Sequence, residues 1–209
     1  MSLSYITKLL VSKQLRFEEG QIIFLQKPMA FVPVEFYVHL TKEILKKRRE
    51  MIEIYLDAWK AGVIFMRDVA RKYSMAKFED RYMEAMNIIS SAGFGDYQTL
   101  GFEGGKYAYF KIFNNPIAEI FHPSKEPIDH VLRGFNGGGG SPVHERIINT
   151  IETECKAVNG KFCIHLNAAT EILKEKKWTK FVKKQLDLNF LLKEQKKFVK
   201  EMGYEEIKP

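Results

Sequence analysis

The amino-acid sequence predicts an α+β fold in which an antiparallel sheet is flanked by helices, with a helical extension at the C-terminus. Three observations support this prediction. Apolar residues recur at three- and four-residue steps in residues 34–73, 77–89 and 170–209, a spacing typical of helices. In residues 95–113 and 146–168 they alternate with polar residues around glycine turns, which is typical of antiparallel hairpins. This order does not contain regular βαβ units, which argues against a Rossmann arrangement.

The N-terminal half begins with a predicted hairpin and continues with long helices. In LRFEEGQIIFL two short apolar runs surround Glu18-Glu19-Gly20, which indicates a tight turn between two strands. One or two helices are expected over residues 34–73, with a bend near Ala61-Gly62. A further helix is expected over residues 77–89, ended by Ser90-Ser91-Ala92-Gly93, in which the glycine can cap the helix.

The second half alternates strands with helices. GDYQTLGFEGGKYAYFKIF predicts two antiparallel strands joined at Glu103-Gly104-Gly105, and RIINTIETEC and KFCIHLNA are again strand-like. A short helix is expected to begin near Asp129. The quartet Gly137-Gly138-Gly139-Gly140 is not followed by the Lys-Ser or Lys-Thr of a phosphate loop, so we expect it to loosen or end that helix. One or two charged helices are expected from Thr170.

The composition predicts a globular chain without a membrane span. Of the 209 residues, 45% are hydrophobic, and no apolar run approaches the roughly 18 residues that span a bilayer. The N-terminus lacks the pattern of a secretory signal, so the expected location is the cytoplasm. The net charge is +7, and residues 170–209 supply most of it with eleven lysines against seven acids. Because these lysines alternate with acids and apolar residues, we expect a solvated helix face and no direct nucleic-acid binding.

The two cysteines of the chain lie close together in ETECKAVNGKFC. Paired thiols in the cytoplasm more often bind metal or react than form a disulfide. Their relative position depends on the turn at Asn159-Gly160. A two-residue loop would place Cys155 and Cys163 on opposite faces of the hairpin, whereas a three-residue loop with Gly160 in the left-handed conformation would place them opposite each other. A pair of small buried side chains and a pair of metal ligands are both compatible with this spacing.

Two thiols do not complete a zinc site, and the nearest further candidates are Glu152 and Glu154. Strict alternation along a strand turns both carboxylates away from Cys155. A carboxylate therefore joins the thiols only if the strand twists or bulges just before Cys155.

DHVLRGFNGGGG followed by INTIETECKAVNGKFCIHL resembles the 4-vinyl-reductase domain family. That family typically shows a Cys-His or similar pair opening a helix, then Arg-Gly and a run of small residues, then Glu-x-x-Cys and a second Cys after seven residues. The corresponding residues here are Asp129-His130, Arg133-Gly134, Glu152, Cys155 and Cys163. The matching core covers about residues 114–167, and the upstream hairpin and long helices are similar to the region that precedes the domain in archaeal members.

The resemblance implies a zinc site. In the aromatic-sensing transcription activators that contain this domain, three cysteines and one glutamate hold zinc. Carried over to this chain, the later cysteines are Cys155 and Cys163, the glutamate is Glu152, and Asp129 stands in place of the first cysteine. Aspartate binds zinc through oxygen, and His130 is the alternative ligand through nitrogen. We therefore expect a structural zinc that joins the cysteine hairpin to the helix beginning at Asp129.

The resemblance also implies a fold and a function. The fold is related to subunits of the transport protein particle (TRAPP), a vesicle-tethering complex: a small antiparallel sheet flanked by helices, usually dimeric, with an apolar pocket. Family members bind hydrophobic small molecules or take part in assemblies, and one group is linked to bacteriochlorophyll synthesis. We expect a homodimeric protein that binds or senses a hydrophobic or aromatic small molecule. A reductase of tetrapyrrole or related metabolism and an interaction scaffold are the alternatives.

The chain divides accordingly into three parts. Residues 1–113 form an N-terminal hairpin and helices that pack with the domain, residues 114–169 form the core motif, and residues 170–209 form a charged helical extension. Aromatic residues expected to line a pocket come from the first part, although an ordinary core uses the same residue types. These candidate pocket residues are Trp59, Phe65, Tyr107, Tyr109 and Phe110.

The remaining histidines and the catalytic signals are weak. His122, His144 and His165 show no spacing that pairs them, so we expect surface or satisfied core residues. A nucleophilic Cys155 would need a histidine at a defined register, which the spacing does not provide, and no dinucleotide fingerprint is present. The sequence therefore leaves an enzymatic role open and favours binding over catalysis.

Overall fold

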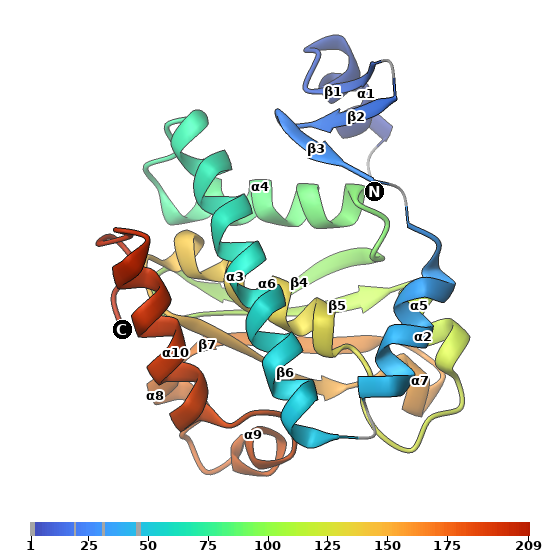
Figure 1. The fold of residues 1–209 in the computed structure, drawn as a ribbon, viewed down its shortest axis with the longest axis vertical. Coiled ribbons are helices and arrows are strands. Elements are labelled where there is room, and N and C mark those ends of the chain that lie inside the picture. The colour runs from blue at the N-terminus through green and yellow to red at the C-terminus, as the bar shows by residue number, and fades with distance from the viewer. Residues whose placement is uncertain (1–2, 19, 31, 45–46) are drawn as a thin grey trace.

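The computed structural model describes residues 3–18, 20–30, 32–44 and 47–209 (Figure 1). Glu19 of the expected first turn lies outside these residues. Among the described residues, no helix is both long and apolar enough to cross a membrane. The elements along the chain are α1 Leu3–Val11, β1 Leu15–Glu18, β2 Gln21–Phe24, β3 Lys27–Met29, α2 Val34–Ile44, α3 Arg48–Lys72, α4 Phe78–Ser91, β4 Asp96–Glu103, β5 Tyr107–Phe113, α5 Pro116–Phe121, α6 His130–His144, β6 Ile148–Glu154, α7 Lys156–Asn159, β7 Cys163–Ala169, α8 Thr170–Leu173, α9 Thr179–Gln185 and α10 Leu188–Glu201.

The central sheet has four antiparallel strands in the order β4-β5-β7-β6. Both predicted hairpins are confirmed, and β5 and β7 join them in the middle of the sheet. The first hairpin precedes residue 114 and the second follows it, so one sheet connects the first two parts into which the sequence was divided. Figure 1 shows α3 and α6 crossing in front of this sheet, with α4 alongside.

Helix α3 runs without a break through Ala61-Gly62, where a bend was expected. Lys47, which directly precedes α3, has an extended backbone, so residues 34–73 do not form one continuous helix. Gly62 serves packing. A Cβ at this position would overlap the carbonyl oxygen of Phe135 and lie 2.8 Å from the backbone nitrogen of Gly139. The absence of a side chain therefore lets α3 and α6 approach closely.

The four consecutive glycines neither loosen nor end their helix, so the expectation that they would do so is wrong. Helix α6 has 15 residues and contains all four glycines and Pro142. A Cβ at Gly138 would overlap the carbonyl oxygen of Trp59, and a Cβ at Gly137 would lie 2.9 Å from the hydroxyl oxygen of Thr150. Each glycine costs a helix roughly 1 kcal/mol relative to alanine. Close packing of α6 between α3 and β6 offsets that cost.

Strand β6 lies at the edge of the sheet, yet side chains satisfy its outward backbone groups. The indole nitrogen of Trp59 on α3 donates to the carbonyl oxygen of Ile148 at 2.8 Å. The Gln185 amide on α9 accepts from the Glu152 nitrogen at 2.8 Å and donates to the Glu152 carbonyl oxygen at 2.7 Å. Side chains thus take the place of a further strand.

The N-terminal segment forms a small unit of its own. The predicted hairpin is confirmed, with Leu15 opposite Phe24, and β3 adds a third antiparallel strand. The ring of Phe24 stacks on Phe65 of α3 with centroids 6.4 Å apart, which joins this unit to the main core. In Figure 1 the unit lies at the top, beyond α4.

The C-terminal segment forms three helices, α8, α9 and α10, where one or two were expected. Trp178 precedes α9 and packs its ring against Tyr109 of β5 with centroids 6.3 Å apart. Phe198 of α10 packs edge-on against Trp59 at 6.1 Å. The C-terminal segment therefore covers the second face of the sheet and the outer side of α3.

Candidate metal centre and adjoining apolar cavity

Five side chains of metal-ligand type meet in the interior. Glu152 lies near the end of β6, Cys155 directly precedes α7, Cys163 and His165 lie on β7, and Asp129 directly precedes α6. None has more than 3% of its surface exposed. We call these five residues the Glu152 cluster.

The turn between β6 and β7 differs from both loops considered from the sequence. A short helix, α7, connects the strands, and Cys155 lies outside the β ladder. Gly160 has φ +73°, the left-handed conformation expected for the longer loop. The thiols still meet, because the backbone nitrogen of Lys156 donates to Cys163 Sγ at 3.2 Å and so holds the start of α7 against β7.

A bulge before Cys155 turns one carboxylate inward. The pairing of β6 with β7 shifts between Glu152, opposite His165, and Glu154, opposite Ile164. Glu152 is fully buried, whereas Glu154 is exposed. The bulge is the irregularity that a carboxylate needs to join the thiols, and it selects Glu152.

Two overlapping sets of ligand atoms share Glu152. Glu152, Cys155 and Cys163 form one set, and Asp129, Glu152 and His165 form the other; within each set all ligand atoms lie within 4.8 Å of one another. His165 Nε2 is 3.6 Å from Asp129 Oδ2 and 3.9 Å from Glu152 Oε1. The sets contain thiols, carboxylates and an imidazole, which are the side chains that bind zinc, so this buried group can hold a metal ion.

Several polar atoms of the Glu152 cluster have no hydrogen-bond partner in the part of the chain that the structure describes. They are Asp129 Oδ1, both carboxylate oxygens of Glu152 and His165 Nε2. The buried guanidinium of Arg133 donates to the carbonyl oxygen of Thr150 at 3.3 Å, and it forms no ion pair with either carboxylate within the described part of the chain. Buried carboxylates without a partner cost several kcal/mol. A cation bound among these atoms would remove that cost, so the donor set fits a metal.

The electrostatics of the cluster favour protonated thiols unless a cation binds. A hydrogen bond with Cys155, burial and the nearby carboxylates all raise the pKa of the Cys163 thiol. The hydrogen bond with Cys163 lowers the pKa of Cys155, but burial and the same carboxylates outweigh it, so this pKa is also raised. Burial lowers the pKa of His165, but contacts with Asp129 and Glu152 outweigh it and raise the pKa overall. A bound cation would reverse the effect on the thiols.

His130, the alternative ligand, points elsewhere. Its Nδ1 contacts the guanidinium of Arg133, and it belongs to neither ligand set. Asp129 belongs to the second set, and its Oδ2 accepts a hydrogen bond from the Asn115 amide at 2.7 Å. The structure thus brings Asp129 together with Glu152, Cys155 and Cys163, and separates His130 from them.

His165 is the cluster residue that the sequence analysis missed. The expectation of a surface or satisfied core residue is wrong for His165 and for His144, because both are buried and have ring nitrogens without a partner. It holds for His122, whose Nδ1 lies 3.0 Å from the carbonyl oxygen of Ala157. The available signal was the spacing Cys163-x-His165, because residues two apart on a strand share a face.

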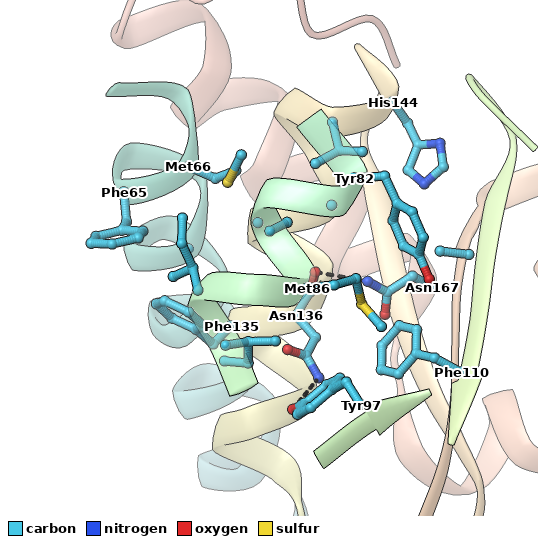
Figure 2. Close-up of a pocket in the computed structure, with 18 residues that line it drawn as sticks. Phe65, Met66, Tyr82, Met86, Tyr97, Phe110, Phe135, Asn136, His144 and Asn167 are labelled. Carbon is cyan, nitrogen blue, oxygen red and sulfur yellow. Dashed lines mark hydrogen bonds between the residues drawn. The ribbon is translucent and has the colours of Figure 1, made fainter. Parts of the chain in front are cut away.

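An apolar cavity of about 60 Å³ lies next to the cluster, between the sheet and the helices α3, α4 and α6 (Figure 2). Its wall contains many aromatic and methionine side chains and few polar ones. The main lining side chains are Phe65, Met66, Tyr82, Met86, Tyr97, Phe110, Phe135, Asn136, His144 and Asn167.

Two of the five candidate pocket residues line this cavity, and three do not. Phe65 and Phe110 are on its wall. Tyr107 and Tyr109 belong to the other core cluster, because alternation along β5 turns them to the opposite face from Phe110. Trp59 also lies in that second core, against α10 and β6.

Asn136 connects the cavity to the Glu152 cluster. Its side-chain nitrogen lies 3.4 Å from the Tyr97 hydroxyl and 3.2 Å from His165 Nδ1. Phe110 packs its ring against His165 with centroids 5.9 Å apart. Both contacts fix the position of the His165 ring, so the cavity wall and the cluster share a support.

Fold and site together define a class of protein: an α+β domain with an internal apolar cavity beside a buried group of metal-ligand type. The structure is similar to the phenol-responsive sensory domain of the transcription activator PoxR with phenol, with 16% identity and a TM-score of 0.71, covering 84% of this chain and 94% of that domain. This similarity confirms the predicted fold class.

Two further solved structures belong to the families that the sequence resembles. A vinyl-4-reductase family protein from Methanocaldococcus jannaschii shows 14% identity and a TM-score of 0.42, covering 66% of this chain and 82% of that chain. A trafficking protein particle complex subunit 3 from Naegleria fowleri, covalently bound to palmitic acid, shows 11% identity and a TM-score of 0.48, covering 65% and 92%. The sequence matches no protein-family model and no curated protein.

Proposed function

We propose that this protein binds a small aromatic molecule in the cavity and acts as a sensory or binding domain, with a zinc ion in the Glu152 cluster. The observation that carries the proposal is the apolar, aromatic-lined cavity between the sheet and three helices. It occurs in the fold of a domain that responds to phenol. Apolar cavities with a few polar groups are the usual binding sites for small ligands.

The size of the cavity limits the ligand and requires local adjustment. Its volume is about 60 Å³, smaller than the cavity of about 150 Å³ that accommodates benzene in an apolar core. Met86, Phe65 and Phe135 are half-buried lining side chains, and methionine adapts its shape readily. A one-ring ligand therefore binds by displacing such side chains.

Ligand titration tests the binding function. Isothermal titration calorimetry with phenol and with toluene should detect saturable binding of at least one compound to the wild-type chain. Ala85 lines the cavity from α4, so Ala85→Phe should fill the space and abolish binding. Met83 on the same helix is 57% exposed, and Met83→Phe is the matched control that should bind as wild type does. Binding that survives Ala85→Phe unchanged would contradict the assignment of the cavity.

The two alternative functions give different results in the same experiments. A scaffold whose cavity is filled by its own side chains would bind neither compound. A reductase would need a redox cofactor, and titration with flavin or nicotinamide nucleotides, followed by absorbance, tests for one.

The proposed zinc site uses Glu152, Cys155 and Cys163 together with Asp129, and His165 adds a fifth candidate ligand. Support comes from the buried carboxylate oxygens without partners and from the overlapping ligand sets. When bound, zinc would neutralise the carboxylates and hold β6, β7 and the start of α6 together. The alternative to bound zinc is a protonated His165 that neutralises the carboxylates of Asp129 and Glu152.

Elemental analysis of purified protein separates these two states of the cluster. We expect a stoichiometric amount of zinc in wild type and its loss in Cys163→Ala. The control His39→Ala removes an exposed histidine on α2 and should keep the metal. A metal-free wild type, or unchanged zinc in Cys163→Ala, would contradict the proposal.

The proposed homodimer would use the N-terminal unit. Among the described residues, half of the exposed large apolar side chains belong to residues 10–36. These exposed side chains are Leu10, Val11, Phe17, Met29, Val32 and Phe36. Large exposed apolar patches favour association. Light scattering should show a dimer for wild type and a monomer for Phe17→Glu. A monomeric wild type would contradict this part of the proposal.

A further inference from the structure

His144 is buried at one end of the cavity and has unused hydrogen-bonding groups. Its side chain is 1% exposed, it lines the cavity, and neither ring nitrogen has a hydrogen-bond partner among the described residues. Figure 2 shows His144 at one end of the cavity and Tyr97 at the other. Buried polar atoms without partners are rare in native proteins, so each one requires an explanation.

The other labelled polar side chains of the cavity wall already have partners. The Tyr82 hydroxyl is 2.7 Å from the Thr99 hydroxyl, and the Tyr97 hydroxyl accepts from Asn136. The Asn167 amide accepts from Thr150 and donates to the Asn136 carbonyl oxygen. His144 therefore has free hydrogen-bonding capacity that a ligand in this cavity could use.

Neighbouring residues determine the orientation of His144. Its ring contacts the ring of Phe102 with centroids 5.3 Å apart, and Phe102 stacks on Tyr82 at 4.2 Å. Arg81 holds the flanking backbone, because its Nε donates to the Val143 carbonyl oxygen at 3.2 Å. A side chain held in this way offers its hydrogen-bonding atoms in a defined direction, which is what selectivity requires.

The charge state of His144 defines the kind of ligand. Burial, with a smaller contribution from the positive charge of Arg81, lowers the pKa of His144 to about 4. The imidazole is therefore neutral at pH 7, with one nitrogen that donates and one that accepts. A neutral imidazole in an apolar cavity can satisfy a hydroxyl group but cannot compensate the desolvation of a carboxylate.

We propose that His144 is the hydrogen-bonding residue of this cavity and that it selects an uncharged aromatic ring carrying one hydroxyl group over the hydrocarbon of the same shape. This inference rests on the proposed binding function and specifies its ligand class. The two kinds of ligand differ in whether His144 gains a hydrogen-bond partner. A hydrocarbon leaves His144 without a partner, whereas a phenolic hydroxyl satisfies it and gains a partner in return.

Calorimetry on the full-length chain with phenol, toluene and benzoate tests the inference. Phenol and toluene differ by a hydroxyl and a methyl group on the same ring. Wild type should bind phenol about tenfold more tightly than toluene, the ratio expected from roughly one buried hydrogen bond, and should not bind benzoate measurably. In His144→Phe the preference for phenol should disappear while toluene still binds. His144→Gln, which keeps a polar group, should retain part of the preference.

The control His39→Phe changes an exposed histidine on α2 and should leave the phenol-to-toluene ratio unchanged. A phenol preference that persists in His144→Phe, or equal affinities in wild type, would overturn the role of His144 and leave the proposed binding function intact. Failure of wild type to bind either compound would instead overturn the proposed function, and this inference with it.

A second measurement does not depend on the folding of His144→Phe. In protein with ¹⁵N-labelled histidine, phenol should shift the ring-nitrogen resonances of His144 and toluene should leave them nearly unchanged. His144→Gln assigns these resonances among the five histidines of the chain. Identical shifts with both compounds would overturn the proposed hydrogen bond.

Discussion

The two faces of the four-stranded sheet carry different kinds of side chain, although the same strands build both. Toward α3, α4 and α6, the paired residues Glu152 and His165 form the metal-type cluster, and Phe110, opposite His165 on β5, lines the cavity. On the other face the next residues, Ile151 and Leu166, lie in an apolar core with the C-terminal segment. One face contains polar groups and empty space, and the other is filled.

This difference shows how one strand can serve stability and function at once. Residues of β7 alternate between the faces, so His165 and Asn167 contact α6 while Leu166 and Ala168 join the apolar core. The filled face supplies burial energy, and the face toward α6 can therefore tolerate unpaired polar atoms. Changes on the two faces should affect different properties, which the following experiments separate.

The largest effect is expected where α6 contacts α3. Gly138→Ala would place a Cβ against the Trp59 carbonyl oxygen, so the helices must separate, and the loss in unfolding free energy should be on the order of 4 kcal/mol. Gly139→Ala is the matched control. Its Cβ would meet only Met66 at 3.9 Å and the Gly62 oxygen at 4.0 Å, and alanine favours helix, so stability should stay equal or rise slightly. Urea denaturation measures both, and similar losses would contradict the packing argument.

On the filled face, Leu166→Ala should lower the unfolding free energy by about 3 kcal/mol, because it removes a side chain that is 3% exposed. The ratio of phenol to toluene affinity should not change. Leu100→Ala, at an exposed position of β4, should cost about 0.5 kcal/mol or less. A changed ligand preference in Leu166→Ala would show that the two faces are not independent.

In the cluster, Glu152→Gln should lower the unfolding free energy when metal is bound and should not lower it when metal is absent. With zinc bound, loss of a ligand should weaken metal binding by at least the 10- to 100-fold that loss of an outer-shell partner costs, and so lower the unfolding free energy by about 2 kcal/mol or more. With a chelator present, the same change removes a buried charge and should leave stability equal or higher. Thermal unfolding in zinc and in chelator measures the difference. The same loss in both conditions would indicate that Glu152 has a role unrelated to metal.

The smallest expected effect is a dependence of stability on pH through His144. The pKa of His144 is lowered from 6.5 to about 4, so the unfolded chain binds a proton at pH values where the folded chain does not. The contribution of His144 to stability should therefore be complete above about pH 7 and fall as the pH drops below 6.5, by about 1 kcal/mol at pH 5.5. His130, whose pKa is also lowered by burial, adds to the same trend. His144→Phe should show a weaker pH dependence of urea unfolding, and an unchanged dependence would contradict the assignment.

The elements that were predicted well are those determined by neighbouring residues. The strands of both hairpins and helix α4 follow from periodicity and turn residues, and the cluster of Glu152, Cys155 and Cys163 was predicted from the resemblance. His165 was missed because its position depends on the register of β7 against β6. That register includes a bulge, which strict alternation does not anticipate.

Glycine illustrates the limit most clearly. By local propensity, four glycines in a row weaken a helix, and that reasoning predicted an interrupted helix. The contact with α3 decided otherwise, because Gly138 lies where no side chain fits against Trp59. Likewise, the sequence indicated aromatic pocket residues, but the choice of Phe65 and Phe110 over Trp59, Tyr107 and Tyr109 was made by which face each one occupies.

The sequence by itself therefore predicted the α+β class and most of the helices and strands, and the family resemblance added four residues of the Glu152 cluster: Asp129, Glu152, Cys155 and Cys163. Periodicity, turn chemistry and motif spacing are local properties that a single chain displays directly. The tertiary structure decided the addition of His165, the place of the cavity and the partnerless position of His144. These depend on contacts between residues far apart in the chain, where close packing, strand register and burial set what each side chain can reach.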